Sequence, residues 1–242
     1  MQIDSIALNL RPRSVWEGCD LGIRLLQSWL GPVFRCYLAV ALPCLALCLA
    51  AGALAAWLPA LLIWLAKPWL DRTILFVLSR ALFGVTTRVG EVWAARHAVW
   101  LAGLGRTLTL QRLSASRSFL QPILQLEGLS GSALRYRLRQ VAGGRRAVAR
   151  AAGLAFVCAE LAVVLSLLVV SLWLAPRSLG LEWNPIDSLP GSRLVFLISL
   201  AYGAAVAFLE PFYVAAGFGM YVNRRVALEA WDIEQEFRRA FA

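Results

Sequence analysis

Residues 36–66 read CYLAVALPCLALCLAAGALAAWLPALLIWLA, a run of 31 residues without a charged side chain. As one helix this run would measure about 46 Å at 1.5 Å per residue, well beyond the ~30 Å hydrocarbon thickness of a bilayer. It contains AGA at 51–53 and WLP at 57–59, a composition typical of a tight turn in which proline begins a new helix. We therefore predict a hairpin of two helices, the first from about residue 33 to 52 and the second from about residue 55 onward.

The composition of the whole chain agrees with membrane segments. Hydrophobic residues make up 60% of its 242 residues and charged residues 16%, whereas soluble domains have about 45–50% and about 25%. This excludes a water-soluble enzyme and indicates an integral membrane protein. Residues 153–176 and 194–223 are further apolar stretches, interrupted only by Glu160 and Glu210. Each is long enough for one crossing, so we expect an all-α membrane protein with four transmembrane helices, the first two forming the tight hairpin.

The distribution of basic residues indicates an orientation. Residues 67–150 hold 14 of the 24 basic residues and three acidic ones, whereas residues 177–193 hold two of each. Because cytoplasmic loops are enriched in lysine and arginine, we expect the first segment in the cytoplasm and the second outside. Both chain ends then lie in the cytoplasm (N-in/C-in). Three crossings instead of four would place the four N-terminal arginines outside.

On this basis the chain divides into five parts. They are a cytoplasmic N-terminal arm with an amphipathic helix (1–32), the transmembrane hairpin whose charged second helix runs toward the cytoplasm (33–83), a basic cytoplasmic helical layer (84–150), transmembrane helices 3 and 4 with a short external loop at 176–193 (151–223), and a C-terminal cytoplasmic amphipathic helix (224–242). The apolar face of the C-terminal helix has three alternative partners: the protein's own cytoplasmic layer, the lipid surface or another protein.

Two cytoplasmic segments carry signals for contact with lipid. Ser14 and Glu17 form a capping box at the start of a helix that Gly31 and Pro32 are expected to end, and its apolar face suits the inner leaflet. A short basic helix is expected from about residue 132 to 141. Its arginines and the two that follow are predicted to contact anionic lipid: Arg135, Arg137, Arg139, Arg145 and Arg146. Since this accounts for the net charge of +10 and the sequence has no nucleic-acid-binding motif, we expect no nucleic-acid partner.

Charged residues within the apolar segments are the candidate site. The expected intramembrane charge cluster consists of Lys67, Asp71, Arg72, Glu160 and Glu210. Because an ionised side chain in hydrocarbon costs at least ~2.5–3.5 kcal/mol, such groups face the bundle interior and pair. Lys67 and Asp71 lie one helical turn apart and suit a pair, with Lys67 or Arg72 available to the glutamates. The cluster either fixes the register of the helices or forms a polar pocket or proton path, and Pro211 is expected to kink the last crossing beside it.

No catalytic, cofactor or metal site is expected. The only histidine, His97, has no acid on its helix face, and the sequence has no phosphate-binding loop and no His-Glu-x-x-His pattern. Cys44 and Cys48 share a helix face but have no third ligand. Small residues at 203, 207, 215 and 219 are spaced for close helix packing, which includes the packing of a homo-oligomer.

Three phrases of the sequence carry a resemblance. They are LRPRSVWEGCDLG at 10–22, KPWLDR at 67–72 with LSRALFG at 78–84, and EPFYVAAGF at 210–218 with NRR at 223–225 and LEAWDIE at 228–234. Together they resemble an uncharacterised family of proteobacterial polytopic inner-membrane proteins, of the kind encoded beside MoxR-class AAA+ ATPases and proteins with von Willebrand A-type domains. The resemblance implies a multi-pass protein of the bacterial inner membrane that works through partners, such as that ATPase or a neighbouring membrane protein.

We therefore expect a scaffold or adaptor subunit of an envelope-assembly or AAA+ ATPase-linked system, without catalysis of its own. Its contacts would come from the 67–150 layer and the C-terminal helix. The alternative is a small transport, lipid-handling or proton-coupled membrane subunit that uses the intramembrane charge cluster. Membrane lipids are partners in both cases.

Overall fold

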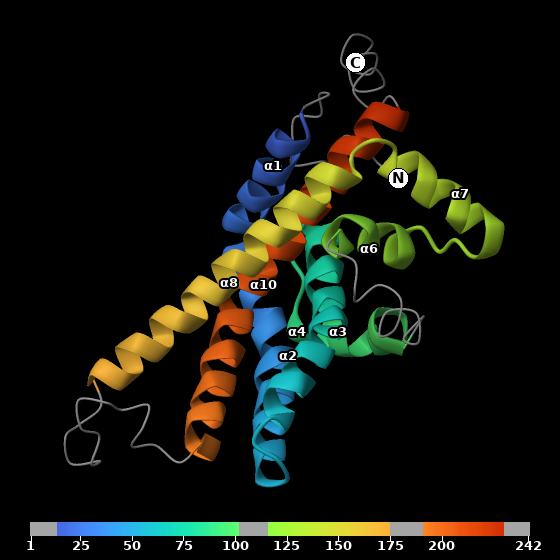
Figure 1. Cartoon of the computed structure of the whole chain (residues 1–242). Helices are drawn as coiled ribbons and strands as arrows, with labels where there is room; N and C mark the ends of the chain where they lie inside the picture. Colours follow the sequence, from blue (N-terminus) through green and yellow to red (C-terminus); the bar gives the residue numbers. More distant parts are fainter. Residues whose placement is uncertain (1–13, 102–115, 175–190, 230–242) are drawn as a thin grey trace.

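The computed structural model describes residues 14–101, 116–174 and 191–229, and within these ranges the secondary structure is helical without strands, as expected (Figure 1). The long helices run along one another, three shorter helices (residues 15–28, 117–126 and 131–142) gather at one end of the bundle, and residues 89–101 lie along its side. The helices are α1 (Val15–Ser28), α2 (Leu30–Ala50), η2 (Ala51–Ala53), α3 (Leu58–Ala81), α4 (Val89–Ala94), the π-helix η3 (His97–Leu101), α6 (Arg117–Leu126), α7 (Gly131–Ala142), α8 (Arg146–Leu174) and α10 (Gly191–Glu229).

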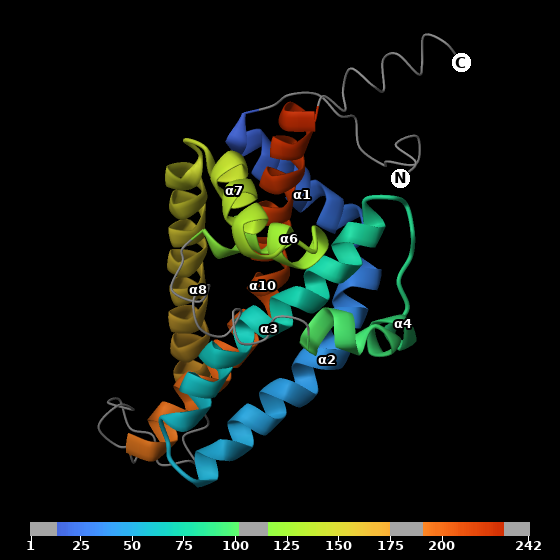
Figure 2. The ribbon, with the colours of Figure 1, turned by 90° about the vertical axis from the view of Figure 1, so that its right-hand side faces the viewer.

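Helices α2 and α3 form the predicted helical hairpin, joined by the short helix η2 (Figure 2). Pro59 occupies the first turn of α3, where its missing N–H costs nothing. A Cβ atom at Gly52 would lie 3.2 Å from Cγ of Pro59, so the turn is tight enough to favour glycine there. Three helical segments are long and apolar enough to cross a membrane: Leu30–Ala53, Arg146–Leu174 and Arg193–Glu229. Helix α3 is not among them.

The break between α1 and α2 differs from the expected one. Gly31 and Pro32 do not end α1 but lie in the first turn of α2, where proline is well tolerated. The chain turns instead at Trp29, whose N–H bonds to the carbonyl oxygens of Leu25 and Leu26. The amphipathic helix at the N-terminus is therefore shorter than predicted and leads directly into α2.

Helix α10 continues through Pro211 for 39 residues, about 58 Å at 1.5 Å per residue. Figures 1 and 2 show that its two ends run in different directions. Proline removes the N–H that would bond to the carbonyl of Ala207, which weakens the helix there. The hydroxyl of Tyr37 on α2 donates to the neighbouring carbonyl of Val206 at 3.2 Å and stabilises this bend. Of the predicted C-terminal helix at 224–242, the part up to Glu229 continues α10, and the remainder lies outside the described residues.

The second half of α10 packs against α1 at backbone contact. A Cβ atom on Gly22 would lie 1.9 Å from the carbonyl oxygen of Ala215, and one on Gly219 would lie 2.2 Å from that of Gly18. Two pairs of small residues spaced by four, one pair on each helix, therefore meet face to face. The sequence favours a location of the apolar face of α1 on the inner leaflet. In the structure, the buried face of this helix packs on α10 instead. Ala215 and Gly219 serve contacts within the chain and not those of a homo-oligomer.

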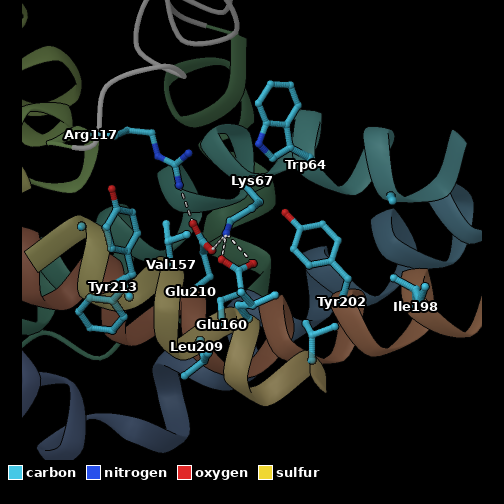
Figure 3. A pocket seen from close by; sticks show the side chains of 15 residues that line it. Trp64, Lys67, Arg117, Val157, Glu160, Ile198, Tyr202, Leu209, Glu210 and Tyr213 are labelled. Atoms are coloured by element: carbon cyan, nitrogen blue, oxygen red, sulfur yellow. Dashed lines mark hydrogen bonds and ion pairs between the residues drawn. The ribbon is translucent and has the colours of Figure 1, made fainter. Parts of the chain in front are cut away.

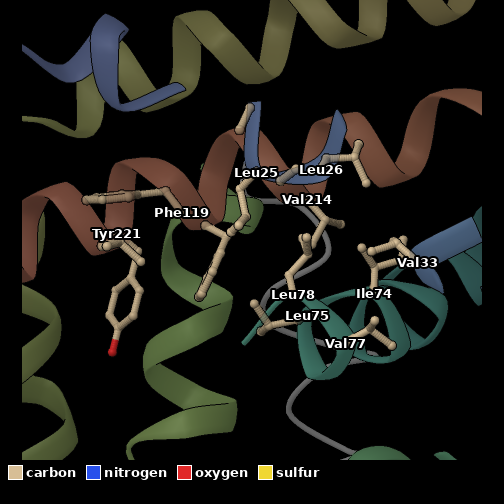
Figure 4. Close-up of a cluster of buried hydrophobic side chains, with 14 of the residues drawn as sticks. Leu25, Leu26, Val33, Ile74, Leu75, Val77, Leu78, Phe119, Val214 and Tyr221 are labelled. Atoms are coloured by element: carbon tan, nitrogen blue, oxygen red, sulfur yellow. The ribbon is translucent and has the colours of Figure 1, made fainter. Parts of the chain in front are cut away.

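Helix α6 packs on another side of α10. A Cβ atom on Gly217 would lie 2.3 Å from the backbone of Ser118, so α6 also reaches the α10 backbone. The main core lies around this region and combines side chains from α1, α2, α3, α6 and α10 (Figure 4). Its fully buried members include Leu26, Val33, Ile74, Leu75, Leu78, Phe119 and Tyr221.

The helix η3 packs on α3, and α4 before it packs on α2. Nε1 of Trp100 donates to the hydroxyl of Thr73 at 2.9 Å, and the ring of Trp100 contacts those of Trp69 and Trp93. His97 lies exposed in η3. Val92, Val99 and Trp100 of this segment are buried, whereas Trp93 and Leu101 are exposed. Residues 102–115 lie outside the described part.

The Gly219→Ala substitution tests the contact between α1 and α10. The added methyl group has no space between Gly18 and Gly22, so we expect a loss of about 1–3 kcal/mol in the free energy of unfolding. Gly203→Ala in the same helix is the matched control, because its Cβ would meet only side chains at 3.6 and 3.9 Å. Thermal unfolding in detergent, followed by circular dichroism, measures both variants. Equal melting temperatures for the two would contradict the described packing.

Candidate functional site

Lys67 of α3 joins the two glutamates of the candidate site. Its Nζ lies 2.7 and 2.8 Å from the carboxylate oxygens of Glu160 on α8 and 3.0 Å from Oε2 of Glu210 on α10 (Figure 3). The three residues are 93 and 50 positions apart in the chain and come from three long helices. The structure thus brings together three of the five charged residues singled out in the sequence through a single ammonium group.

The second cation of the site is Arg117 at the start of α6. Its Nη2 donates to Oε1 of Glu210 at 2.7 Å, and its Nε lies 2.9 Å from Oδ2 of Asp71 in an ion pair that lacks hydrogen-bond geometry. Burial lowers the pKa of Arg117, but the charges of Asp71 and Glu210 outweigh this effect and raise the pKa above its ordinary value. Arg117 therefore stays charged, and the charge cluster consists of Lys67, Asp71, Arg117, Glu160 and Glu210.

Arg72 was predicted to belong to this cluster, but it makes none of the four ion pairs. Its backbone carbonyl accepts a hydrogen bond from Gln125 of α6 at 2.9 Å. Asp71 pairs with Arg117 and not with Lys67, although the two lie one turn apart on α3. The reason is that Lys67 reaches toward α8 and α10, whereas α6 brings its own cation to Asp71.

A polar stripe on α6 explains why Arg117 lies beside Asp71 and Glu210. Arg117, Gln121 and Gln125 recur at every fourth residue and so share one helix face. The amides of Gln121 and Gln125 donate to the backbone carbonyls of Pro68 and Arg72 on α3 at 3.3 and 2.9 Å. Sequence reasoning missed Arg117 because it lies outside the apolar stretches. The spacing of this stripe, on a helix otherwise apolar, is the signal that identifies it.

A cavity of about 550 Å³ opens beside the charge cluster. It lies between α3, α8 and α10, with Arg117 of α6 at one end, and we call it the lateral cleft. Its polar centre consists of Lys67, Arg117, Glu160, Glu210, Tyr202 and Tyr213 (Figure 3). Its other walls are apolar and include the half-exposed or exposed side chains of Trp64, Val157, Leu161 and Ile198. Ligand pockets commonly measure 300–1,000 Å³ and combine apolar walls with a few polar groups, as this cleft does.

The exposed side chains of α8 show where the charge cluster lies along the apolar part of that helix. Arg146 and Arg150 are exposed at the start of this helix, and from Leu154 to Leu174 the exposed large side chains are apolar. Glu160 lies six residues beyond Leu154, about 9 Å along the axis. The charge cluster therefore lies just inside the basic edge of an apolar band, and the apolar walls of the lateral cleft extend away from that edge.

The five arginines predicted to contact lipid do not share one environment. Arg135, Arg139 and Arg146 are exposed, and Arg145 is half-buried. Arg137 instead binds Glu127 at 2.7 Å and also Glu229 at the end of α10. Its hydrogen bonds with Glu127, and then those with Glu229, raise the pKa of Arg137 against the effect of burial. Arg137 thus fastens α7 to α10. For the other four arginines, contact with anionic lipid stays a prediction.

No candidate metal site is found in the described ranges, and four of the five cysteines are buried or half-buried. No group of three or more His, Cys, Asp or Glu side chains suited to a metal ion occurs among these residues. All five cysteines are free thiols, and burial raises the pKa of the Cys19 thiol to about 11, with a further contribution from Asp20. A thiol with that pKa is protonated at neutral pH and poorly reactive.

The chain was compared with protein-family models, with curated proteins and with solved structures, and no match was found in any of the three. The resemblance to a family of proteobacterial inner-membrane proteins therefore stays a prediction. The functional argument rests on the residues of the lateral cleft.

The Lys67→Met substitution tests the energetic role of the cluster. It leaves Glu160 and Glu210 buried without their ammonium partner, and we expect a loss of about 3–5 kcal/mol in the free energy of unfolding. The double variant with Lys67→Met and Glu160→Met has the same net cluster charge as the original chain. We expect it to recover part of that loss.

Arg80→Met is the matched control on the same helix. Arg80 pairs with Glu91 at 2.7 Å, but both side chains are more than a third exposed, so the expected change is below about 1 kcal/mol. Chemical or thermal unfolding in detergent compares the three variants. A similar small effect of Lys67→Met and Arg80→Met would mean that the buried ion pairs do not hold the helices together.

Proposed function

We propose that the protein is a lipid-handling membrane subunit that admits an amphiphilic molecule sideways into the lateral cleft. The observation that carries this proposal is the combination of a buried polar centre with apolar walls that reach the lipid-facing surface. An amphiphile needs both: polar groups for its head and an apolar groove for its chain. This is the alternative expected from the sequence, narrowed to lipid handling by the shape of the site.

The depth of the polar centre supports the same proposal. A lipid headgroup lies near the edge of the hydrocarbon region, and the charge cluster lies about 9 Å inside the apolar band of α8. A lipid entering between α3 and α8 places its head near Glu160 and Lys67. Its chain then runs past Trp64, Val157 and Leu161, in the direction that lipid chains already have in the bilayer.

The proposal includes four membrane crossings, by α2, α3, α8 and the first half of α10. Helix α3 is too charged to qualify by composition, but Lys67 and Asp71 are buried against protein, so they do not oppose its insertion. The side-chain amide of Asn223 on α10 donates to the backbone of Ser14 at 3.2 Å, which supports a location of both ends on one side. The excess of arginine at that end favours the cytoplasm and the inner membrane of a bacterium.

The role of scaffold or adaptor remains a second proposal. The exposed residues Arg135, Arg139 and Arg146 leave a basic surface on α7 and α8 for anionic lipid or a protein partner. However, α1, α6 and the fastening residue Arg137 are already occupied within the chain. The lateral cleft is therefore the more specific feature, and we place the function there. No catalytic step is proposed.

Cysteine labelling tests the four crossings. In a variant whose native cysteines are replaced by alanine, we introduce Leu54→Cys at the tip of the hairpin and Ser132→Cys on α7, both exposed positions. We expect a membrane-impermeant maleimide to label residue 54 in intact cells and residue 132 only after permeabilisation. Labelling of residue 54 only in permeabilised cells would overturn the topology.

Blocking the lateral cleft tests lipid binding. Val157→Trp fills the mouth, so we expect the purified protein to retain severalfold less lipid in native mass spectrometry. Val169→Trp on the same helix is the matched control, because Val169 is similarly exposed but does not line the cleft. We expect it to retain lipid as the unmodified chain does. An equal effect of the two variants would contradict binding in the cleft.

A further inference from the structure

We propose that the lateral cleft selects amphiphiles whose head carries an ammonium group, an inference that rests on the lipid-handling function proposed above. Four charged groups line the lateral cleft: the cations Lys67 and Arg117 and the carboxylates Glu160 and Glu210, whereas Asp71 has no exposed surface and does not line it. Both cations are bound to carboxylates of the chain. An ammonium head beside the partly exposed Glu160 is attracted by its carboxylate, whereas an anionic head there is repelled.

The carboxylate that would receive the ammonium is Glu160. Its side chain is 15% exposed, against 3% for Glu210 and 0% for Asp71. It pairs with Lys67 alone, whereas Glu210 pairs with both Lys67 and Arg117. Glu160 therefore has both the access and the remaining capacity for a second cation. It also lines the cleft, as Lys67 does.

The aromatic walls of the cleft favour the same kind of head. The ring of Tyr202 lies 5.9 Å from Nζ of Lys67, and that of Tyr213 lies 5.3 Å from the guanidinium carbon of Arg117. Trp64 lines the mouth. Aromatic faces attract cations, most strongly where water is excluded. The cleft therefore combines an accessible carboxylate with aromatic rings, and both of its cations are already bound to carboxylates, which leaves little to attract a phosphate.

Two sources supply such a head: an aminophospholipid of the bilayer and a single-chain amine. The test uses the full-length chain in detergent and native mass spectrometry with three probes: phosphatidylethanolamine, phosphatidylglycerol with the same acyl chains, and dodecylamine. We expect phosphatidylethanolamine to bind about tenfold more tightly than phosphatidylglycerol, as one additional charged contact would give. Tight binding of dodecylamine without discrimination between the two phospholipids would assign the site to single-chain amines.

The Glu160→Gln variant makes the test specific. It removes the negative charge of the most exposed carboxylate and leaves Lys67 its partner Glu210, so we expect it to fold and to lose the preference for the ammonium head. Glu160→Asp keeps the charge and should keep the preference. Glu91→Gln removes a carboxylate outside the cleft and is the matched control.

The outcomes separate this inference from the proposed function. Equal binding of the two phospholipids and no binding of dodecylamine, with lipid binding still abolished by Val157→Trp, would overturn the headgroup selection alone. The same holds if the preference survives in Glu160→Gln, or if phosphatidylglycerol binds more tightly. Binding that Val157→Trp leaves unchanged would overturn both the selection and the lateral cleft as a lipid site.

Discussion

The burial of three carboxylates in one small volume is the constraint on which the rest of the structure depends. Asp71, Glu160 and Glu210 come from three helices, and none tolerates an apolar environment without a cation nearby. Lys67 satisfies two of them, and the remaining charge requires Arg117. Since Arg117 lies on α6, this requirement brings a short helix from outside the long apolar segments into contact with α3 and α10. The ion pairs thereby join the membrane-compatible helices to the layer that covers one end of the bundle.

The packing of α10 serves the same arrangement. Gly217 lets α6 approach the α10 backbone, and Gly219 on another side does the same for α1. A larger residue at Gly217 would move α6 outward and Arg117 with it. This would lengthen the 2.7 Å contact between Nη2 of Arg117 and Oε1 of Glu210. Two glycines two positions apart in the sequence therefore position two different helices. The electrostatic centre thus depends on backbone contacts about two turns away.

The sequence predicts the helices of this structure better than it predicts which helices and side chains contact one another. An unbroken apolar run with a turn signal at 51–59 is a local pattern, and it correctly predicts the α2–α3 hairpin. The glutamates also stand out locally, as the only charges in their segments. Ion-pair partners cannot be predicted from a local pattern in this way. Asp71 and Arg117 lie 46 residues apart, and only the path of the chain in three dimensions brings them together. For the same reason, the apolar face of α1 was assigned to lipid, whereas the small residues on α10 provide its actual partner.

The distribution of charge between the helices bears on whether the cluster serves structure alone. Apolar side chains often stabilise a buried interface as well as ion pairs do. The chain already uses this solution, since α2 packs on α3 without a charged residue between Arg35 and the turn at 51–53. One of the four ion pairs, between Lys67 and Glu160, instead joins α3 to α8 across a cavity, where the two helices scarcely touch. If helix register were the only purpose of this pair, a tightly packed interface would be the cheaper place for it. Its position at the wall of an open cleft is better explained by a molecule that enters the cleft.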